Sequence, residues 1–467
     1  MAVLVALTIT SCVPSVVTRN ADKSTPGSYS DNAQDTTNSA SVRWADFFTD
    51  PYLNSLIDTA LSHNQELNIV MQEIQVSRNE VRARKGEYLP FVHLEGAAAV
   101  DKPGRYTRWG AVEENTDIEP GKAMPEPYRD FLVGAFATWE VDIWNKLHNA
   151  KDAAVSRYLA SIEGRNFLKT QLVAEIANSY YELLALDNQL DILKQNIEIQ
   201  SNALVIVKLQ KEATRVTELA VRRFEAQVAH TKALQYGIQQ RIIETENHIN
   251  FLVGRFPQPV ARNSQGFNDL VPEKMYAGIP SQLLENRPDV RQAELGLMAA
   301  RLDVKVARKN FYPSLGIMAG VGLNAFNATY LIQKPGAMLY SLAGDLTAPL
   351  INRNAIKAAY YSANAKQVQA AYNYEKVVLN AYIEVANQLA MISNLEKSFD
   401  LKTQEVEALT ASITISNNLF RSARADYMEV LLTQRDALES RMELIETRKQ
   451  QMNAMVNVYQ ALGGGWN

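Results

Sequence analysis

The sequence predicts a mostly α-helical protein with a small β part, in which one structural unit occurs twice. Three observations lead to this prediction. The 467 residues include only 21 Gly and 16 Pro, concentrated in a few places, so most of the chain lacks residues that interrupt helices. Short segments in which polar and apolar residues alternate separate the helical spans. A motif that precedes one of these segments also recurs before another.

The longest predicted helical span, residues 352–462, contains neither Gly nor Pro, and the spans 145–211 and 217–253 contain one Gly each. Apolar residues recur in them at steps of three and four, as from Leu172 to Leu193, which is typical of coiled coils. At 1.5 Å per residue, the span 145–211 would reach about 100 Å as an unbroken helix. No compact globular domain requires a rod of that length.

The alternating segments are 91–100, 138–143, 315–324 and 342–348. They predict two strand hairpins, at about 91–143 and about 314–349, with strands near the length that a tilted membrane strand needs. In a membrane barrel the polar alternate positions would face a water-filled lumen. These positions are Glu140, Asp142, Asn324, Asp345 and Thr347. A soluble sheet shows similar alternation, so the strands alone leave both readings open.

No run of about 18 apolar residues follows the first residues of the chain, so a protein that spans a bilayer here would have to use strands. Two hairpins cannot close a barrel by themselves, because eight strands is about the practical minimum. In a membrane barrel the edge strands would therefore require partners.

The duplication appears in a short motif, because Ala83-Arg84-Lys85 before the first hairpin recurs as Ala307-Arg308-Lys309 before the second. The predicted units are 42–254 and 280–467, joined by a linker at 255–279. Each unit reads as helix, strand hairpin, very long helix, tight turn and returning helix. The turns near 211–217 and 421–427 are expected to form the tips of the two helical hairpins.

The single cysteine, Cys12, ends an apolar leader. Ile9-Thr10-Ser11-Cys12 resembles a bacterial lipoprotein box, so we expect residues 1–12 to be a signal peptide and Cys12 to carry a covalent lipid. The basic front of a signal peptide is missing, which suggests a truncated start. The polar residues 13–41 are expected to be a flexible tether. The alternative is an incidental or buried cysteine.

Other classes of function find little support. The net charge of -4 and the lack of a Lys/Arg run argue against nucleic-acid binding. The five histidines show no metal-binding spacing, so no metal centre and no cofactor other than the lipid are expected. No set of nucleophile, base and orienting residue can be named, so we do not expect an enzyme.

Several segments resemble the TolC/OprM-like outer-membrane efflux family, lipoprotein (NodT-type) branch. There are four such segments, and their first residues are Trp44-Ala45-Asp46-Phe47-Phe48, Leu284-Glu285-Asn286-Arg287-Pro288-Asp289, Phe311-Tyr312-Pro313 and Tyr459-Gln460-Ala461-Leu462. The resemblance covers nearly the whole chain after the leader, and the segments occur in the family's order. Arg287-Pro288-Asp289 also reads as a helix start with a structural role.

The resemblance implies a homotrimer in which each chain gives four strands to one transmembrane β-barrel of twelve, above a long α-helical barrel in the periplasm. It implies a lipid-anchored subunit in the outer membrane that serves as the passive exit duct of a tripartite RND-type efflux pump for small molecules such as drugs. The expected partners are a periplasmic adaptor (membrane fusion) protein, an inner-membrane RND transporter and outer-membrane lipid. Alternatives are a duct for type I protein secretion or a lipid-anchored, non-conducting scaffold or adhesin.

By the same resemblance, the hairpin tips narrow the tube and meet the adaptor. The tip residues singled out are Arg215, Glu218, Arg424, Asp426, Tyr427 and Glu429. Threefold symmetry would turn Asp426 and Glu429 into acidic rings that favour cations. The family often has Gly where this chain has Ala213 and Ala423, which leaves the turn geometry open. Asp426 could instead be an ordinary helix cap.

Overall fold

The computed structural model describes residues 13–29, 36–272, 274–422 and 424–466. Chain contacts divide it into two compact units. The first contains Gln75–Leu159, Leu295–Ala371 and the beginning of the chain to Asn20; the second contains Ala21–Ile74, Ala160–Glu294 and Tyr372–Asn467. The predicted leader with Cys12, and Ala423 in the second tip, lie outside the described residues.

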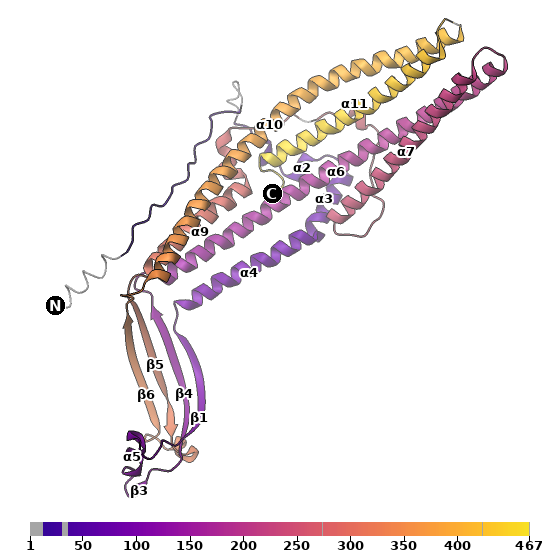
Figure 1. Ribbon diagram of the computed structural model, residues 1–467. Helices are drawn as coiled ribbons and strands as arrows, with labels where there is room; N and C mark the ends of the chain where they lie inside the picture. The colour runs from indigo at the N-terminus through magenta and orange to yellow at the C-terminus, as the bar shows by residue number, and fades with distance from the viewer. Residues whose placement is uncertain (1–12, 30–35, 273, 423, 467) are drawn as a thin grey trace. The chain divides into compact units, whose positions relative to one another are not determined.

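Matched helix lengths support the internal duplication. Helix α6 (Lys146–Glu212) has 67 residues and α10 (Asn354–Arg421) has 68. The returning helices α7 (Glu218–Leu252) and α11 (Tyr427–Ala461) have 35 residues each. In Figure 1, α7 runs back beside α6 and α11 runs back beside α10.

A helix of similar length also precedes each strand hairpin: α4 (Gln65–Glu87) has 23 residues and α9 (Pro288–Lys309) has 22. The shorter described helices are η2 (Ser39–Ser41), α2 (Trp44–Phe47), α3 (Pro51–His63), α5 (Arg108–Glu114), η3 (Phe267–Asp269), η4 (Pro280–Gln282), α8 (Leu283–Asn286) and η5 (Ala328–Ile332).

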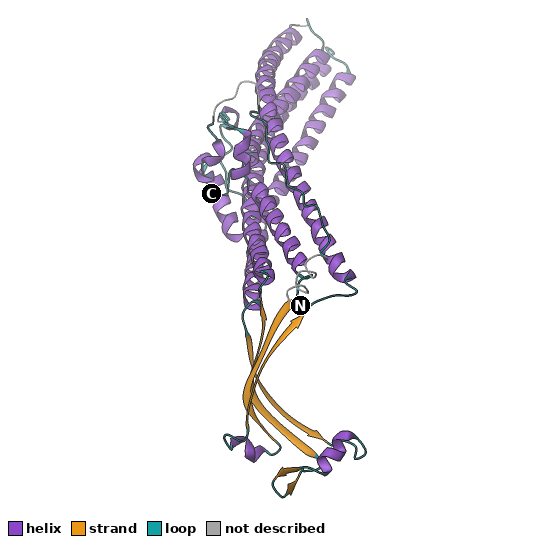
Figure 2. Ribbon diagram, turned by 90° about the vertical axis from the view of Figure 1, so that its left-hand side faces the viewer, coloured by secondary structure: helices purple, strands orange, loops and turns teal. Residues whose placement is uncertain are grey.

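The first unit contains a four-stranded antiparallel sheet in the order β1-β4-β5-β6, whose strands lie side by side in Figures 1 and 2. Its strands are β1 (Phe91–Asp101), β4 (Tyr128–Val141), β5 (Ser314–Ala325) and β6 (Met338–Thr347). The loop between β1 and β4 adds a two-stranded ribbon, β2 (Asp117–Glu119) and β3 (Lys122–Ala123). Both predicted hairpins are therefore present, and they pair with each other through β4 and β5.

One predicted strand position is wrong. Strand β4 ends at Val141, so Asp142 is not a strand residue. Its carboxylate accepts hydrogen bonds from the backbone N–H of His148 at 2.8 Å and from the His148 ring at 2.7 Å. Burial raises the pKa of Asp142, but these bonds and others from the first turn of α6 bring it below its ordinary value. Asp142 thus stabilises the start of α6, where a carboxylate is favoured.

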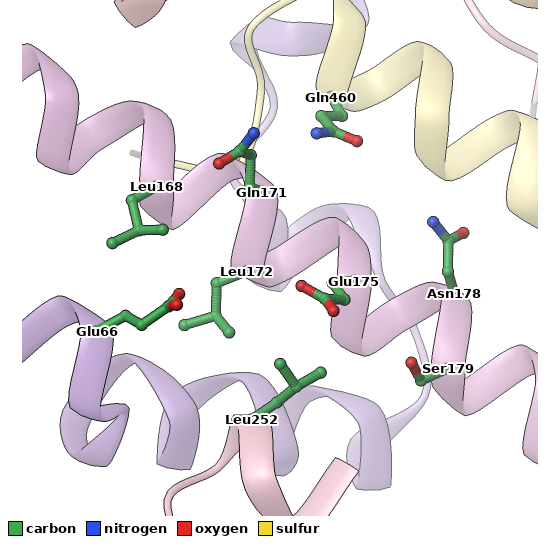
Figure 3. Close-up of a pocket in the computed structure, with 9 residues that line it drawn as sticks. All are labelled: Glu66, Leu168, Gln171, Leu172, Glu175, Asn178, Ser179, Leu252 and Gln460. Atoms are coloured by element: carbon green, nitrogen blue, oxygen red, sulfur yellow. The ribbon is translucent and has the colours of Figure 1, made fainter. Parts of the chain in front are cut away.

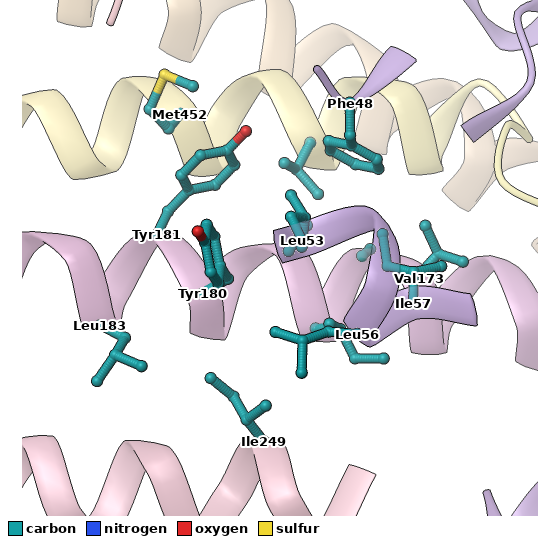
Figure 4. Close-up of a cluster of buried hydrophobic side chains, with 14 of the residues drawn as sticks. Phe48, Leu53, Leu56, Ile57, Val173, Tyr180, Tyr181, Leu183, Ile249 and Met452 are labelled. Carbon is teal, nitrogen blue, oxygen red and sulfur yellow. The ribbon is translucent and has the colours of Figure 1, made fainter. Parts of the chain in front are cut away.

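The core of the second unit surrounds the middle of α6. Tyr180, Leu183 and Ile176 are fully buried there, together with Leu53 and Ile57 of α3. Figure 4 shows these α3 side chains against α6, with Ile249 of α7 and Met452 of α11 nearby. The Tyr180 hydroxyl donates to the Asp50 carboxylate at 2.7 Å, so the buried polar group at this position is satisfied.

The segment expected to be a flexible tether is partly docked. In the first unit, Val13 and Val16 pack against a cluster that includes Phe311 and Tyr360. The Arg19 backbone exchanges two hydrogen bonds with the amide of Gln367, at 2.9 and 2.7 Å. Residues 13–20 therefore lie against their own unit instead of forming a free linker.

The following residues are held in the second unit. The Asp22 backbone donates to Glu375 at 3.0 Å. The Tyr29 ring stacks on Tyr382, with centroids 5.4 Å apart. The expectation of a free tether is thus wrong for residues 13–29, while part of the remainder, 30–35, lies outside the described residues.

Among the helices that the structure describes, none is both long enough and apolar enough to cross a membrane.

Candidate channel surface and helical tip

The cross-strand register places the predicted polar strand positions on one face of the sheet. Glu140 pairs with Gly316, and Gly316 pairs with Asp345, so the two acids flank a glycine in one row. Asn324, at the other end of β5, is on the same face because it lies an even number of residues from Gly316. His93 and Glu95 of β1 extend this polar face through their pairing with Phe136 and Gly134.

Polar contacts hold these side chains in place. The Lys146 ammonium binds the Glu140 carboxylate at 2.5 Å. The Asn324 amide donates to Asp130 at 2.6 Å, and the Thr347 hydroxyl donates to Asp345 at 2.9 Å. Asp130 and Lys146 were not singled out from the sequence. The sequence could have indicated Asp130 as a residue of the polar face, because it lies an even number of residues from Glu140 on the same strand, β4.

The opposite face of the sheet is apolar and open. It carries Leu94 of β1, Val133 of β4, Val321 of β5 and Leu342 of β6, each exposed over more than half of its surface. These exposed apolar side chains extend across all four strands, and hydration of such a continuous apolar surface is unfavourable. The sheet therefore has one face suited to water and one suited to an apolar environment.

Both edges of this sheet lack a neighbour. In the part of the chain that the structure describes, β1 pairs only with β4, and β6 pairs only with β5. Each edge therefore presents unpaired backbone N–H and C=O groups over ten or eleven residues. Long unprotected edges of this kind are templates for pairing with another strand.

The first helical tip is a turn in which neighbouring cations neutralise Glu218. Helix α6 ends at Glu212, and Thr214 has φ 57°, which reverses the chain. The Thr217 hydroxyl caps α7 by accepting from the Ala220 backbone N–H. Glu218 forms ion pairs with Lys211 at 2.8 Å and Arg222 at 2.9 Å. The hydrogen bond and charge of Lys211, assisted by Arg222, lower the pKa of the Glu218 carboxyl.

The second tip is built differently. Asp426 has the extended backbone of an N-cap residue before α11, but its side chain makes no capping hydrogen bond. Asp426 and Glu429 are both exposed, and among the described residues neither has an ion-pair partner within 4.0 Å. The predicted alternative, in which Asp426 is simply a side-chain cap, is therefore not what the structure has. Both carboxylates remain available for other charged groups.

The two tips are joined by an apolar cluster. Val207, Val221 and Phe224 of the first helical hairpin pack with Leu431 of the second, and Tyr427 lies against this group. Tyr427 therefore helps to pack the two tips together. The sequence indicates it as a gate residue and does not predict this packing role. Arg215 and Arg424 are exposed at the turns.

Arg287 is the centre of a buried polar network. Only 4% of its surface is exposed. The guanidinium binds Asp289 through two nitrogens at 2.7 and 3.0 Å, Glu384 at 2.7 Å and the carbonyl of Ala461 at 2.8 Å. It thus connects the start of α9 with α10 and with the C-terminal end of α11. The structural role expected for Arg287-Pro288-Asp289 agrees with these contacts, although the sequence did not indicate their number.

A cavity of about 400 Å³ lies beside α6 (Figure 3). Glu175 and Leu172 point into it from α6, with Glu66 of α4, Leu252 of α7 and Gln460 of α11 around them. The Glu175 carboxylate lies 3.1 Å from Nε2 of the exposed His248. Across the described residues, no group of three or more His, Cys, Asp or Glu side chains is placed to hold a metal ion.

The family model described as outer membrane efflux protein matches residues 56–255 and 279–464. These two segments correspond closely to the two repeats.

Among curated proteins, the chain is 27% identical to the solvent efflux pump outer membrane protein SrpC of Pseudomonas putida, over 90% of this chain and 87% of that protein. It is 26% identical to the cation efflux system protein CusC of Escherichia coli O6:H1, over 93% and 90%. It is 23% identical to the probable outer membrane lipoprotein SilC of Salmonella typhimurium, over 91% and 88%.

Among solved structures, the open state of the Neisseria gonorrhoeae MtrE outer membrane channel superposes with a TM-score of 0.85. The match covers 98% of this chain and 99% of that one, at 21% identity. It establishes a common fold.

Proposed function

The chain belongs to the outer membrane efflux protein family, and from that premise we propose that it is the exit-duct subunit of a tripartite, RND-type efflux pump. In this proposal the chain forms a homotrimer that spans the outer membrane and extends into the periplasm. Small molecules leave the cell through it without any chemical step, so the chain is not an enzyme. A periplasmic adaptor protein and an inner-membrane RND transporter are its partners.

The observation that carries this proposal is the two-faced sheet. A lipid-facing strand surface has to be apolar and a lumen-facing one has to be wettable. Leu94, Val133, Val321 and Leu342 lie on one face and Glu140, Asn324 and Asp345 on the other. A scaffold or adhesin that conducts nothing has no need for such a division.

The open edges of the sheet support the trimer. Backbone groups in hydrocarbon must be paired, and a barrel achieves this only when it closes. Four strands are too few for closure, whereas three chains supply twelve, which lies within the range of outer-membrane barrels. In this arrangement β1 of one copy pairs with β6 of the next.

We place the gate at the second tip. Asp426 and Glu429 are exposed and lack ion-pair partners among the described residues, so threefold symmetry would bring their charges around one axis. Such rings hold cations and respond to basic groups of a partner protein. Glu218 in the first tip is a weaker candidate, because Lys211 and Arg222 already neutralise it.

A lipid on Cys12 would anchor the chain in the outer membrane. This part of the proposal rests on the sequence Ile9-Thr10-Ser11-Cys12 and on the resemblance to SilC. Val13 packs near Phe311, three residues before β5 begins, so the docked segment begins close to the strand ends of its own unit.

Type I protein secretion would use the same architecture and remains the second candidate within transport. The relatives named for solvent and cation efflux favour the small-molecule pump.

The test is to purify the full-length protein, measure its mass in detergent and record single-channel conductance in planar bilayers on the same sample. A trimer with discrete conductance steps is expected. A monomer that gives no conductance would reject the duct and favour the anchored scaffold. Export of a protein substrate but not of small dyes in cells that carry the matching pump would favour secretion.

A further inference from the structure

A second cavity, of about 560 Å³, lies in the second unit between the linker and helices α10 and α11. Its apolar lining comes from Val271 and Met275 of the linker, Leu389 and Phe399 of α10, and Met455 of α11. Arg448 and Gln451 of α11 also line it. The duct proposed above makes no use of this cavity.

Arg448 is unusual among the buried arginines of the chain. Its exposure is 8%, compared with 4% for Arg287, and Arg262 is less enclosed, with 16% of its side chain exposed. Arg287 and Arg262 each bind two carboxylates. No described carboxylate lies within 4.0 Å of Arg448. A buried positive charge without an acidic partner is costly to maintain.

The contacts of Arg448 orient its guanidinium without neutralising it. One terminal nitrogen donates to the Gln451 side chain at 2.9 Å, and the other donates to the carbonyl of Asn268 at 3.2 Å. Gln451 is held in turn by its bond to the carbonyl of Leu395 at 3.2 Å. The guanidinium lies 3.7 Å from the centre of the Phe399 ring, and its buried Nε has no hydrogen-bond partner.

The surroundings of the guanidinium penalise its charge. Burial lowers the pKa of Arg448, and the more distant charge of Asp269 opposes this only in part. Each terminal nitrogen still carries an N–H bond beyond the contacts named above, because a guanidinium has five donors. A guanidinium that is already oriented and partly desolvated, and that has free N–H donors, can bind an anion through charge-assisted hydrogen bonds.

Charged residues in the lining limit what can enter the cavity. Lys274 is one of them, together with Glu396 and Asp400, and both of these acids are exposed. Their negative charges disfavour multiply charged anions. The apolar lining favours a ligand that carries hydrocarbon along with its charge.

We propose that this cavity is a binding site for a small amphiphilic monoanion, a single carboxylate or sulfonate on an apolar body, with Arg448 holding the acidic group. The apolar body lies against Val271, Leu389 and Met455. Two sources could supply such a molecule: fatty acid from the membrane, or an exported anionic solute.

The test uses the full-length protein in nanodiscs and isothermal titration calorimetry. Decanoate is the first probe and decanol is its neutral counterpart. Saturable binding of decanoate that is at least tenfold tighter than that of decanol is expected, since a charge-assisted hydrogen bond contributes about that factor. Palmitate and naphthalene-2-sulfonate then distinguish the sources: preference for the long chain indicates membrane fatty acid, and preference for the aromatic anion indicates an exported solute.

Three variants control the measurement. Arg448→Met is expected to weaken decanoate binding about tenfold or more and to leave decanol unchanged. Arg441→Met alters a half-buried arginine of the same helix that does not line the cavity and should change neither. Leu389→Trp adds bulk at a half-buried lining position and should abolish binding while Arg448 is retained, so the proposal can be tested even if the Arg448 variant does not fold. Equal binding of decanoate and decanol, or unchanged decanoate binding in Leu389→Trp, would overturn the proposal.

Discussion

The ring of Phe136 lies over Gly320, its direct partner across β4 and β5. A Cβ atom on Gly320 would be 2.7 Å from Cδ1 of Phe136 and 3.0 Å from the Ser341 hydroxyl. The glycine thus leaves the space in which a bulky aromatic side chain can lie on the polar face of the sheet. Gly320 thus relieves crowding between Phe136 of β4 and Ser341 of β6.

Gly320→Val should therefore impair assembly. The added side chain has to displace the Phe136 ring, and overpacking of this kind costs about 1–3 kcal/mol. We expect less heat-resistant oligomer on semi-native gels and a lower melting temperature. Gly316→Val is the matched control on the same strand and face, since a Cβ there would meet its nearest atom at an ordinary 3.8 Å. Equal behaviour of the two variants would show that Phe136 does not depend on the glycine.

An arginine at two adjacent residues of β1 should have different effects on membrane insertion. Leu94 lies on the apolar face and is 87% exposed, whereas Glu95 lies on the polar face. Leu94→Arg would put a charge into hydrocarbon at a cost of about 2–4 kcal/mol near the bilayer midplane. Glu95→Arg would place the same charge toward the proposed lumen.

Membrane fractionation after mild extraction distinguishes the two variants. Leu94→Arg should be depleted from the outer-membrane fraction, while Glu95→Arg should remain there with altered ion selectivity. Depletion of both variants to the same extent would contradict the assignment of the faces.

The faces of the sheet could be predicted because alternation is a local property. Glu140, Asn324 and Asp345 are polar positions of alternating strands, and the strand register puts them on one face. Asp142 was wrongly included because the same alternation continues past Val141, where the chain already turns into α6. Its bonds to the backbone N–H and the ring of His148 come from a helix start that the strand pattern does not reveal.

Contacts between distant segments were harder to predict. Residues 13–29 are polar enough to suggest a free tether, yet Val13 and Val16 are apolar residues that pack against Phe311 and Tyr360. These two valines were the available signal. The partners of Arg287 lie 97 and 174 residues away, at Glu384 and Ala461, and local sequence cannot show such neighbours.

Arg287→Met should strongly reduce stability. It would leave Asp289 and Glu384 without their shared cation, and breaking a buried ion pair costs about 3–5 kcal/mol. A lower midpoint in chemical denaturation is the expected result. Arg287→Lys should recover part of the loss, because it keeps the charge but cannot bind Asp289 through two nitrogens. Arg43→Met, at an exposed pair with Asp46, should have almost no effect, and a similar loss there would point to a nonspecific cause.

The carboxylates of the second tip should control the closed channel. Replacing Asp426 and Glu429 together, as Asp426→Asn and Glu429→Gln, removes two exposed charges that have no ion-pair partner among the described residues. The apolar cluster of Val207, Phe224 and Leu431 stays intact, so folding should be preserved. We expect a weaker preference for cations, since an acidic ring attracts cations.

Glu218→Gln in the first tip is the matched control for this gate. Lys211 and Arg222 neutralise Glu218, so its removal should leave cation preference nearly unchanged. Ionic strength gives a further check, because exposed charges are screened within about 8 Å at 0.15 M salt. Raising the salt concentration should therefore reduce the difference between the parent channel and the Asp426/Glu429 double variant. A conductance and selectivity unchanged in the double variant at low salt would place the gate away from these two residues.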